Sequence, residues 1–167
     1  MASSSDVFVA FTGHWPLGRV LFFGAILTAV LLVAPDARAQ GVGFQGGGTV
    51  DPDQFYVGSH FETPEIAPGL SIRPGIDGGF GDGLKIASIT VDVLFKLQIA
   101  STWKLYQGGG PVVHIIRYDY FDETDTTGGV TGVFGFEHQS GFYTEFRAQG
   151  GGGPNLKFGI GITIHPK

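Results

Sequence analysis

Apolar and polar residues alternate with a period of two along most of the chain after residue 40. The clearest segment is Lys85–Ile99. Its apolar set is Ala87, Ile89, Val91, Val93, Phe95, Leu97 and Ile99. Its opposite set is Ser88, Thr90, Asp92, Lys96 and Gln98, interrupted by Leu94. Because successive side chains of a strand point to opposite faces, the pattern predicts one long strand with an apolar face and a polar face.

Other segments carry the same alternation with different clarity. It is clear in Gln54–Glu62, Leu70–Gly81, Phe142–Ala148 and a last segment from Leu156 to His165. It is less regular in Trp103–Tyr118, Gly129–Glu137 and, as the weakest candidate, Gly41–Thr49. The Gly108-Gly109-Gly110-Pro111 run is expected to bend or bulge its strand. No segment after residue 39 has a convincing helical period.

Turn-forming residues separate these segments. Asp, Gly, Pro, Ser and Asn gather at 51–53, 64–69, 81–83, 101–102, 122–129, 138–141 and 150–155. Such links between consecutive strands predict an up-and-down antiparallel sheet, and closure of the sheet removes its edges. We therefore expect an all-β fold, a single antiparallel up-and-down β-barrel of about eight strands, preceded by an N-terminal signal helix.

The composition of the two faces indicates which one lies inside. The polar face holds charges of both signs and many glycines, as suits a narrow interior in which charges pair and small residues leave room for long ones. The apolar face is nearly free of charge, as lipid contact requires. A soluble barrel or sandwich with the apolar face inward is the alternative. The expected interior charge network is Arg73, Asp77, Asp92, Lys96, Glu137, Glu145 and Arg147.

These charges have two interpretations. They can line a water path, or they can fill the interior as ion pairs, which is usual for eight-stranded barrels and is the interpretation we favour. A bacterial barrel begins and ends in the periplasm. The outside loops would then be 50–53, 81–84, 119–128 and 149–154, and the periplasmic turns 63–69, 100–102 and 138–141. The outside loop with the most acidic residues contains Asp119, Asp122, Glu123 and Asp125. Clustered carboxylates suit a divalent cation, but a solvated surface loop fits this spacing better.

The first 39 residues have the features of a signal peptide. Arg19 precedes an uncharged apolar run, Pro35 ends it, and Ala37-Arg38-Ala39 supplies a small-x-small cleavage pattern. We expect cleavage between Ala39 and Gln40, which divides the chain into a signal peptide, 1–39, and an outer-membrane barrel domain, 40–167. The apolar run of about 14 to 16 residues is short for a spanning helix, which needs roughly 20. An uncleaved N-terminal anchor is the alternative.

Composition narrows the function classes. Charged residues make up 15% of the chain, against about 25% in a typical soluble domain. The net charge of −5 and the lack of a basic stripe give no reason to expect nucleic-acid binding. There is no cysteine, so stability must come from backbone pairing, packing or the membrane. No cofactor-binding motif is present, because the glycine runs 46–48 and 150–153 lack the strand-to-helix context of a phosphate loop and are interpreted as flexible links.

Three stretches resemble small bacterial outer-membrane barrels of the eight-stranded, OmpA-barrel and OmpX-like group. They are Val50–Phe55, Leu105–Pro111 and Asn155–Gly159. The resemblance implies a barrel in the outer membrane, in contact with outer-membrane lipid and assembled by the barrel-insertion machinery. One departure is the C-terminus. Such barrels usually end on an aromatic residue, whereas here Ile164 is followed by His165-Pro166-Lys167, which puts the usual insertion signal in doubt.

No catalytic constellation stands out, so we expect a non-enzymatic structural or surface-interaction barrel whose loop partner the sequence does not identify. The alternatives are a lipid-modifying enzyme and a soluble periplasmic barrel that binds an apolar ligand. His138, Ser140 and Glu145 resemble the His-x-Ser element of outer-membrane lipid A deacylases, although the acid follows too closely for that family's pattern. His60, His114 and His165 share the polar face, where interior hydrogen bonding explains them better than zinc.

Overall fold

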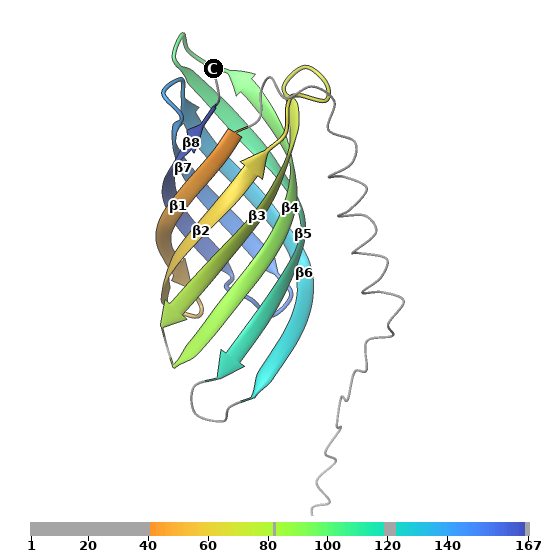
Figure 1. Cartoon of the computed structure of the whole chain (residues 1–167), viewed down its shortest axis with the longest axis vertical. Coiled ribbons are helices and arrows are strands. Elements are labelled where there is room, and N and C mark those ends of the chain that lie inside the picture. Colours follow the sequence, from red (N-terminus) through yellow and green to blue (C-terminus); the bar gives the residue numbers. More distant parts are fainter. Residues whose placement is uncertain (1–40, 82, 119–122, 166–167) are drawn as a thin grey trace, which may run out of the picture. The chain divides into compact units, whose positions relative to one another are not determined.

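The structure, a computed structural model, describes residues 41–81, 83–118 and 123–165 as a closed barrel (Figure 1). Eight antiparallel strands follow one another around its wall in chain order. Their bounds are β1 Gly41–Val50, β2 Gln54–Glu62, β3 Leu70–Gly81, β4 Leu84–Gln98, β5 Trp103–Tyr118, β6 Thr124–His138, β7 Phe142–Gly150 and β8 Leu156–Ile164. The predicted all-β, up-and-down barrel of about eight strands is confirmed.

Closure is made by the first and last strands. β1 pairs with β8 from Val42, opposite Ile164, to Val50, opposite Leu156. No strand of the described sheet therefore presents an unpaired edge, which is the part of a sheet that templates aggregation. β1, which the sequence pattern predicts least clearly, therefore pairs with a neighbour on each side.

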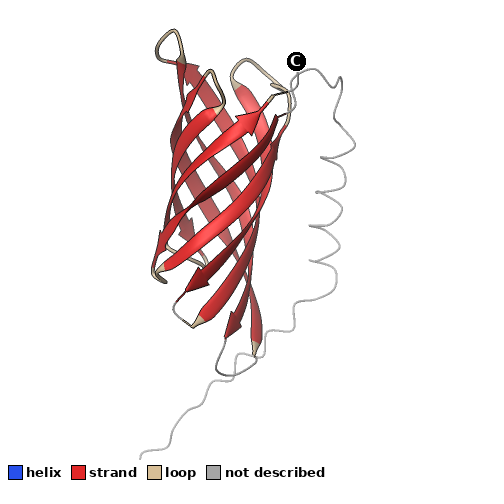
Figure 2. Ribbon diagram, turned by 60° about the vertical axis from the view of Figure 1, so that its left-hand side comes forward, coloured by secondary structure: helices blue, strands red, loops and turns tan. Residues whose placement is uncertain are grey.

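The links between strands divide between the two ends of the barrel (Figure 2). The loop end carries links 51–53 and 151–155, together with the end of β3, the start of β4, the end of β5 and the start of β6. The terminus end carries links 63–69, 99–102 and 139–141, together with the start of β1 and the end of β8. The division agrees with the sequence-based assignment, but the expected 119–128 loop is too long. Residues from Thr124 to Gly128 pair with β5 instead, because backbone pairing needs no apolar alternation.

The glycine-rich part of β5 also differs from expectation, since it contains no register shift. Pairs between β4 and β5 stop at Thr90–Val112 and resume at Val93–Gly109 in the same register. A β-carbon added at Gly108 would lie 2.0 Å from the Val93 carbonyl oxygen, and one at Gly110 would lie 1.8 Å from that of Val91. Glycine is therefore required here by close approach of the β4 backbone, and the predicted bulge is wrong.

Side chains alternate between the two faces as the pattern predicts. Large apolar side chains point away from the barrel, among them Phe55, Ile89, Val130 and Ile160, with exposed fractions of 62%, 42%, 69% and 60%. Most polar and charged strand residues point inward, among them Arg73, Asp92 and Glu145. A small apolar cluster also lies inside, formed by Leu94, Tyr106, Val133 and Tyr143. The structure therefore has the arrangement of a membrane barrel, with the apolar face outward, rather than that of a soluble barrel, with the apolar face inward.

Interior glycines make room for aromatic rings more than for the long charged side chains expected from the sequence. A β-carbon on Gly159 would lie 2.2 Å from the Tyr56 hydroxyl. One on Gly161 would lie 2.5 Å from the Tyr143 ring, and one on Gly135 would lie 2.4 Å from the Tyr106 ring. Tyr106 and Tyr143 thus each cover the glycine paired with them on the neighbouring strand, and Tyr56 covers a glycine two strands away on β8. The rings fill the interior without crowding it.

The expected signal peptide, 1–39, and its cleavage point between Ala39 and Gln40 lie outside the described residues. Within the described residues, no helix is long and apolar enough to cross a membrane.

Candidate functional site: the charged interior of the barrel

The centre of the interior is an ion-pair network around Glu145. Its carboxylate accepts a hydrogen bond from Arg73, two from Arg147, at 2.9 and 3.1 Å, and one from the Tyr106 hydroxyl at 3.0 Å. Arg147 also reaches Asp92, whose carboxylate oxygen lies 2.8 Å from its Nη1 atom. All these side chains are buried. Two positive and two negative charges therefore neutralise one another inside the wall.

Strand pairing explains how these residues meet. Arg73 on β3 lies directly opposite Asp92 on β4. Glu145 and Arg147 are two residues apart on β7 and therefore share its inward face. In the closed strand order β3 and β7 lie on opposite walls, so the Arg73–Glu145 pair crosses the interior. The network therefore connects the two walls at mid-barrel.

A second cluster lies toward the terminus end. The Lys96 ammonium lies 2.6 Å from a carboxylate oxygen of Glu62 and 2.6 Å from one of Glu137. Ser71 donates a weak hydrogen bond to Glu62 at 3.4 Å. Two carboxylates face one ammonium, so this cluster carries one net negative charge. It borders a cavity of about 470 Å³ that opens at the terminus end.

A third cluster lies toward the loop end. Lys157 donates to Asp77 at 2.5 Å and stands over the Tyr56 ring at 5.1 Å from its centre. Arg73 has a similar place over the Tyr106 ring, at 5.2 Å. A cation over an aromatic face is stabilised by the negative charge of that face. Two of the interior cations, Arg73 and Lys157, therefore each stand over a tyrosine ring as well as beside a carboxylate.

The link between β7 and β8 covers this end. Pro154 is fully buried, and a β-carbon on Gly153 would lie 2.2 Å from the His114 ring. The Asn155 side chain donates to the Asp51 carboxylate at 2.5 Å, and the Gly151 carbonyl accepts from Thr127 at 2.7 Å. The glycine run, interpreted from sequence as a flexible link, is held across the barrel mouth.

The structure places each expected member of the charge network inside the barrel, divided among the three clusters. Sequence reasoning missed two members, Glu62 and Lys157. Both lie on the polar face of their segments, so the signal was present. The missing information was the partner: Lys157 meets Asp77 from 80 residues away, and a strand pattern does not show which residues meet across a lumen.

The acidic loop is only partly described. Asp119 and Asp122 lie outside the described residues. Glu123 is exposed, and exposed Asp125 accepts the backbone N–H of Thr126 at 2.7 Å on β6. No group of His, Asp and Glu side chains in the described part of the chain is arranged to hold a metal ion.

The histidines have local partners. His60 contacts Thr163 at 3.2 Å and the Tyr143 hydroxyl at 3.4 Å, and the His114 Nδ1 atom lies 3.0 Å from the Ser88 hydroxyl. His165 is exposed. The described contacts of His60 and His114 are thus hydrogen bonds within the barrel.

His138 and Ser140 do meet, with the hydroxyl 2.9 Å from the Nδ1 atom. The Ser140 backbone N–H donates to the same Nδ1 atom at 3.2 Å, and the Trp103 ring packs against the imidazole at 4.9 Å. The acid of the proposed triad is elsewhere, because Glu145 is held in the central network. The arrangement is a tight turn at the terminus end, without the third group that orients a catalytic base.

No family model matches the chain, and no curated protein matches it. Among solved structures, the N-terminal β-barrel domain of Pseudomonas aeruginosa OprF superposes with a TM-score of 0.59 at 9% identity, covering 76% of this chain and 98% of that one. Ail, the attachment invasion locus protein of Yersinia pestis in complex with the heparin analogue sucrose octasulfate, gives 0.43 at 13%, covering 75% and 93%. The described chain is therefore an eight-stranded antiparallel barrel that matches the small OmpA-like outer-membrane barrels in fold.

Proposed function

We propose that the protein is an integral barrel of the bacterial outer membrane with a structural or surface-interaction role and no enzymatic activity. The single observation that carries this proposal is the arrangement of the two faces. Apolar side chains cover the outside of the closed wall, and ion pairs fill the inside. In water this arrangement would expose the apolar surface and bury the charges, whereas in a bilayer both faces have a suitable environment.

The outer membrane is the location that best suits such a barrel. Bacterial single-chain barrels with an even number of antiparallel strands occur there, and the expected signal peptide, 1–39, would export the chain. The OprF domain supports the fold. The partners we propose are outer-membrane lipid and the barrel-insertion machinery. The loop end would face outward, with links 51–53, 82–83, 119–123 and 151–155 as its contact surface.

We further propose that the interior is closed to ions and solutes. The central network joins opposite walls through Arg73 and Glu145, and the link that covers the loop end contains the buried Pro154. An eight-stranded barrel is narrow enough for side chains to fill it. The charges then hold the walls together rather than attract a permeating ion.

Cell fractionation followed by electrophoresis of the unboiled protein tests the proposal. We expect the mature chain to sediment with the outer membrane, to need detergent for extraction and to change mobility on boiling, because a closed barrel resists unfolding by detergent alone. Recovery of the folded chain in the soluble periplasmic fraction would contradict the proposal and favour a soluble barrel instead.

A further inference from the structure

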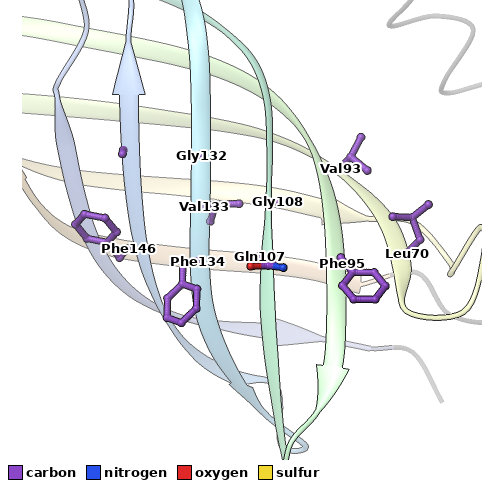
Figure 3. Close-up of a pocket in the computed structure, with 10 residues that line it drawn as sticks. Leu70, Val93, Phe95, Gln107, Gly108, Gly132, Val133, Phe134 and Phe146 are labelled. Atoms are coloured by element: carbon purple, nitrogen blue, oxygen red, sulfur yellow. The ribbon is translucent and has the colours of Figure 1, made fainter.

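A groove of about 550 Å³ lies on the outer surface of the barrel, where strands β4 to β7 pass side by side (Figure 3). Phe95, Phe134 and Phe146 stand along one side of it. Strand pairing aligns these rings in one transverse row, with Gln107 between Phe95 and Phe134. The groove therefore has aromatic walls and one polar group.

The neighbouring row runs from Val93 through Gly109 and Gly132 to Ala148, so its two middle positions have no side chain. Gly132 on β6 pairs with Gly109 on β5 and with Ala148 on β7. A β-carbon added at Gly132 would have no atom within 4 Å, so the surface above it is open. Between membrane helices, small residues let two backbones approach closely, and an outward glycine on a barrel strand gives the same freedom from side-chain bulk. The open surface above Gly132, which forms the floor of the groove, thus allows another protein to pack closely against the strand.

Gln107 gives the groove its chemistry. Among the described strand residues whose side chains face outward, it is the one with a carboxamide, and it is exposed between Phe95 and Phe134, whose exposed fractions are 41% and 43%. Its side chain makes no hydrogen bond to any residue that the structure describes. An amide without a partner in hydrocarbon costs several kcal/mol on apolar transfer scales. This position therefore favours an occupant that can both donate and accept.

A second copy of the chain meets that requirement. A residue that lies at a two-fold axis meets its own counterpart. A primary amide is complementary to itself because it carries both an N–H donor and a C=O acceptor. An acyl chain would fill the groove but would leave the amide unpaired. We propose that the groove is the interface of a symmetric dimer in the membrane, in which the two Gln107 amides are hydrogen-bonded to each other. This inference rests on the proposed placement of the outer face in lipid.

Sedimentation equilibrium of the mature protein in density-matched detergent micelles tests this interface. We expect the unaltered chain to associate reversibly into dimers and Gln107→Leu to weaken the association about tenfold, as loss of a membrane hydrogen bond would. Gly132→Leu fills the floor and should abolish dimerisation. Gly150→Leu is the matched control, because Gly150 also faces outward with nothing within 4 Å but lies outside the groove.

Each variant is first checked for heat-modifiable mobility, so that only folded barrels are compared. A folded but monomeric unaltered chain would overturn the dimer and leave the membrane barrel standing, whereas a chain soluble without detergent would overturn both. Dimerisation that survives Gly132→Leu would also overturn this interface. So would a monomer that copurifies with a lipid displaced by Gly132→Leu, since that result would assign the groove to an acyl chain.

Discussion

Glu145 is the residue at which the interior contacts of the barrel converge. It accepts hydrogen bonds from Arg73, Arg147 and Tyr106 and is buried with all three. A carboxylate in such a place is stable only because the surrounding cations replace the water it has lost. Its removal therefore leaves two buried guanidinium groups with only Asp92 to balance them.

Glu145→Gln is expected to lower the free energy of unfolding by about 3 to 5 kcal/mol, the usual cost of breaking a buried ion pair on one side. Urea titration of the detergent-bound barrel measures this change through the fluorescence of Trp103, the one tryptophan of residues 40–167. Glu123→Gln is the control, because Glu123 is exposed in the β5–β6 link and should change stability by less than about 0.5 kcal/mol. Equal stability of the two variants would contradict the network.

For a single residue, the sequence predicts only which face of the strand its side chain lies on. The alternation places Arg73 and Glu145 on the inward face correctly, because a strand has a strict period of two. It does not show that these residues meet, since 72 positions separate them and the contact depends on the register of every strand between. Glu62 and Lys157 were missed as partners for the same reason, although their faces were correct.

At the scale of the elements, composition and pairing do not always agree. The alternation predicts a strand only from Gly129, whereas β6 begins at Thr124, which pairs with Arg117 of β5 although neither residue is apolar. The sequence pattern therefore underestimates the length of a strand that continues past its alternating apolar residues. It also overestimated the effect of the glycine run in β5, since a glycine cluster can mark close backbone approach as well as a bulge.

Two glycines on adjacent strands provide a matched test of that close approach. Gly108→Ala should destabilise the barrel by about 1 to 3 kcal/mol, the usual cost of overpacking, because its β-carbon would lie 2.0 Å from the Val93 carbonyl oxygen. Gly132→Ala should be tolerated, since nothing lies within 4 Å of the added carbon. Both unfolding midpoints can be measured by the urea titration used for Glu145. A tolerated Gly108→Ala would show that β4 and β5 are further apart than described.

At the scale of the whole molecule, the ion pairs that join opposite walls bear on permeability. We expect the mature protein in a planar lipid bilayer to give no steady ion conductance, because the interior is crossed at mid-barrel and covered by Pro154 at the loop end. A general porin in the same bilayer is the positive control. Regular, long-lived current steps from this chain would contradict a filled interior.

The central claim concerns which face of the wall meets lipid, and collision accessibility of spin labels measures it directly. The chain has no cysteine, so single labels can be placed at Val57→Cys and Ile160→Cys on the outward face, with Gln139→Cys in a terminus-end turn as the aqueous control. In lipid bilayers we predict that labels at Val57 and Ile160 collide more often with oxygen than with a water-soluble nickel complex, and that the label at Gln139 does the reverse. Higher accessibility to the nickel complex at Val57 and Ile160 would place the apolar face in water and contradict the account.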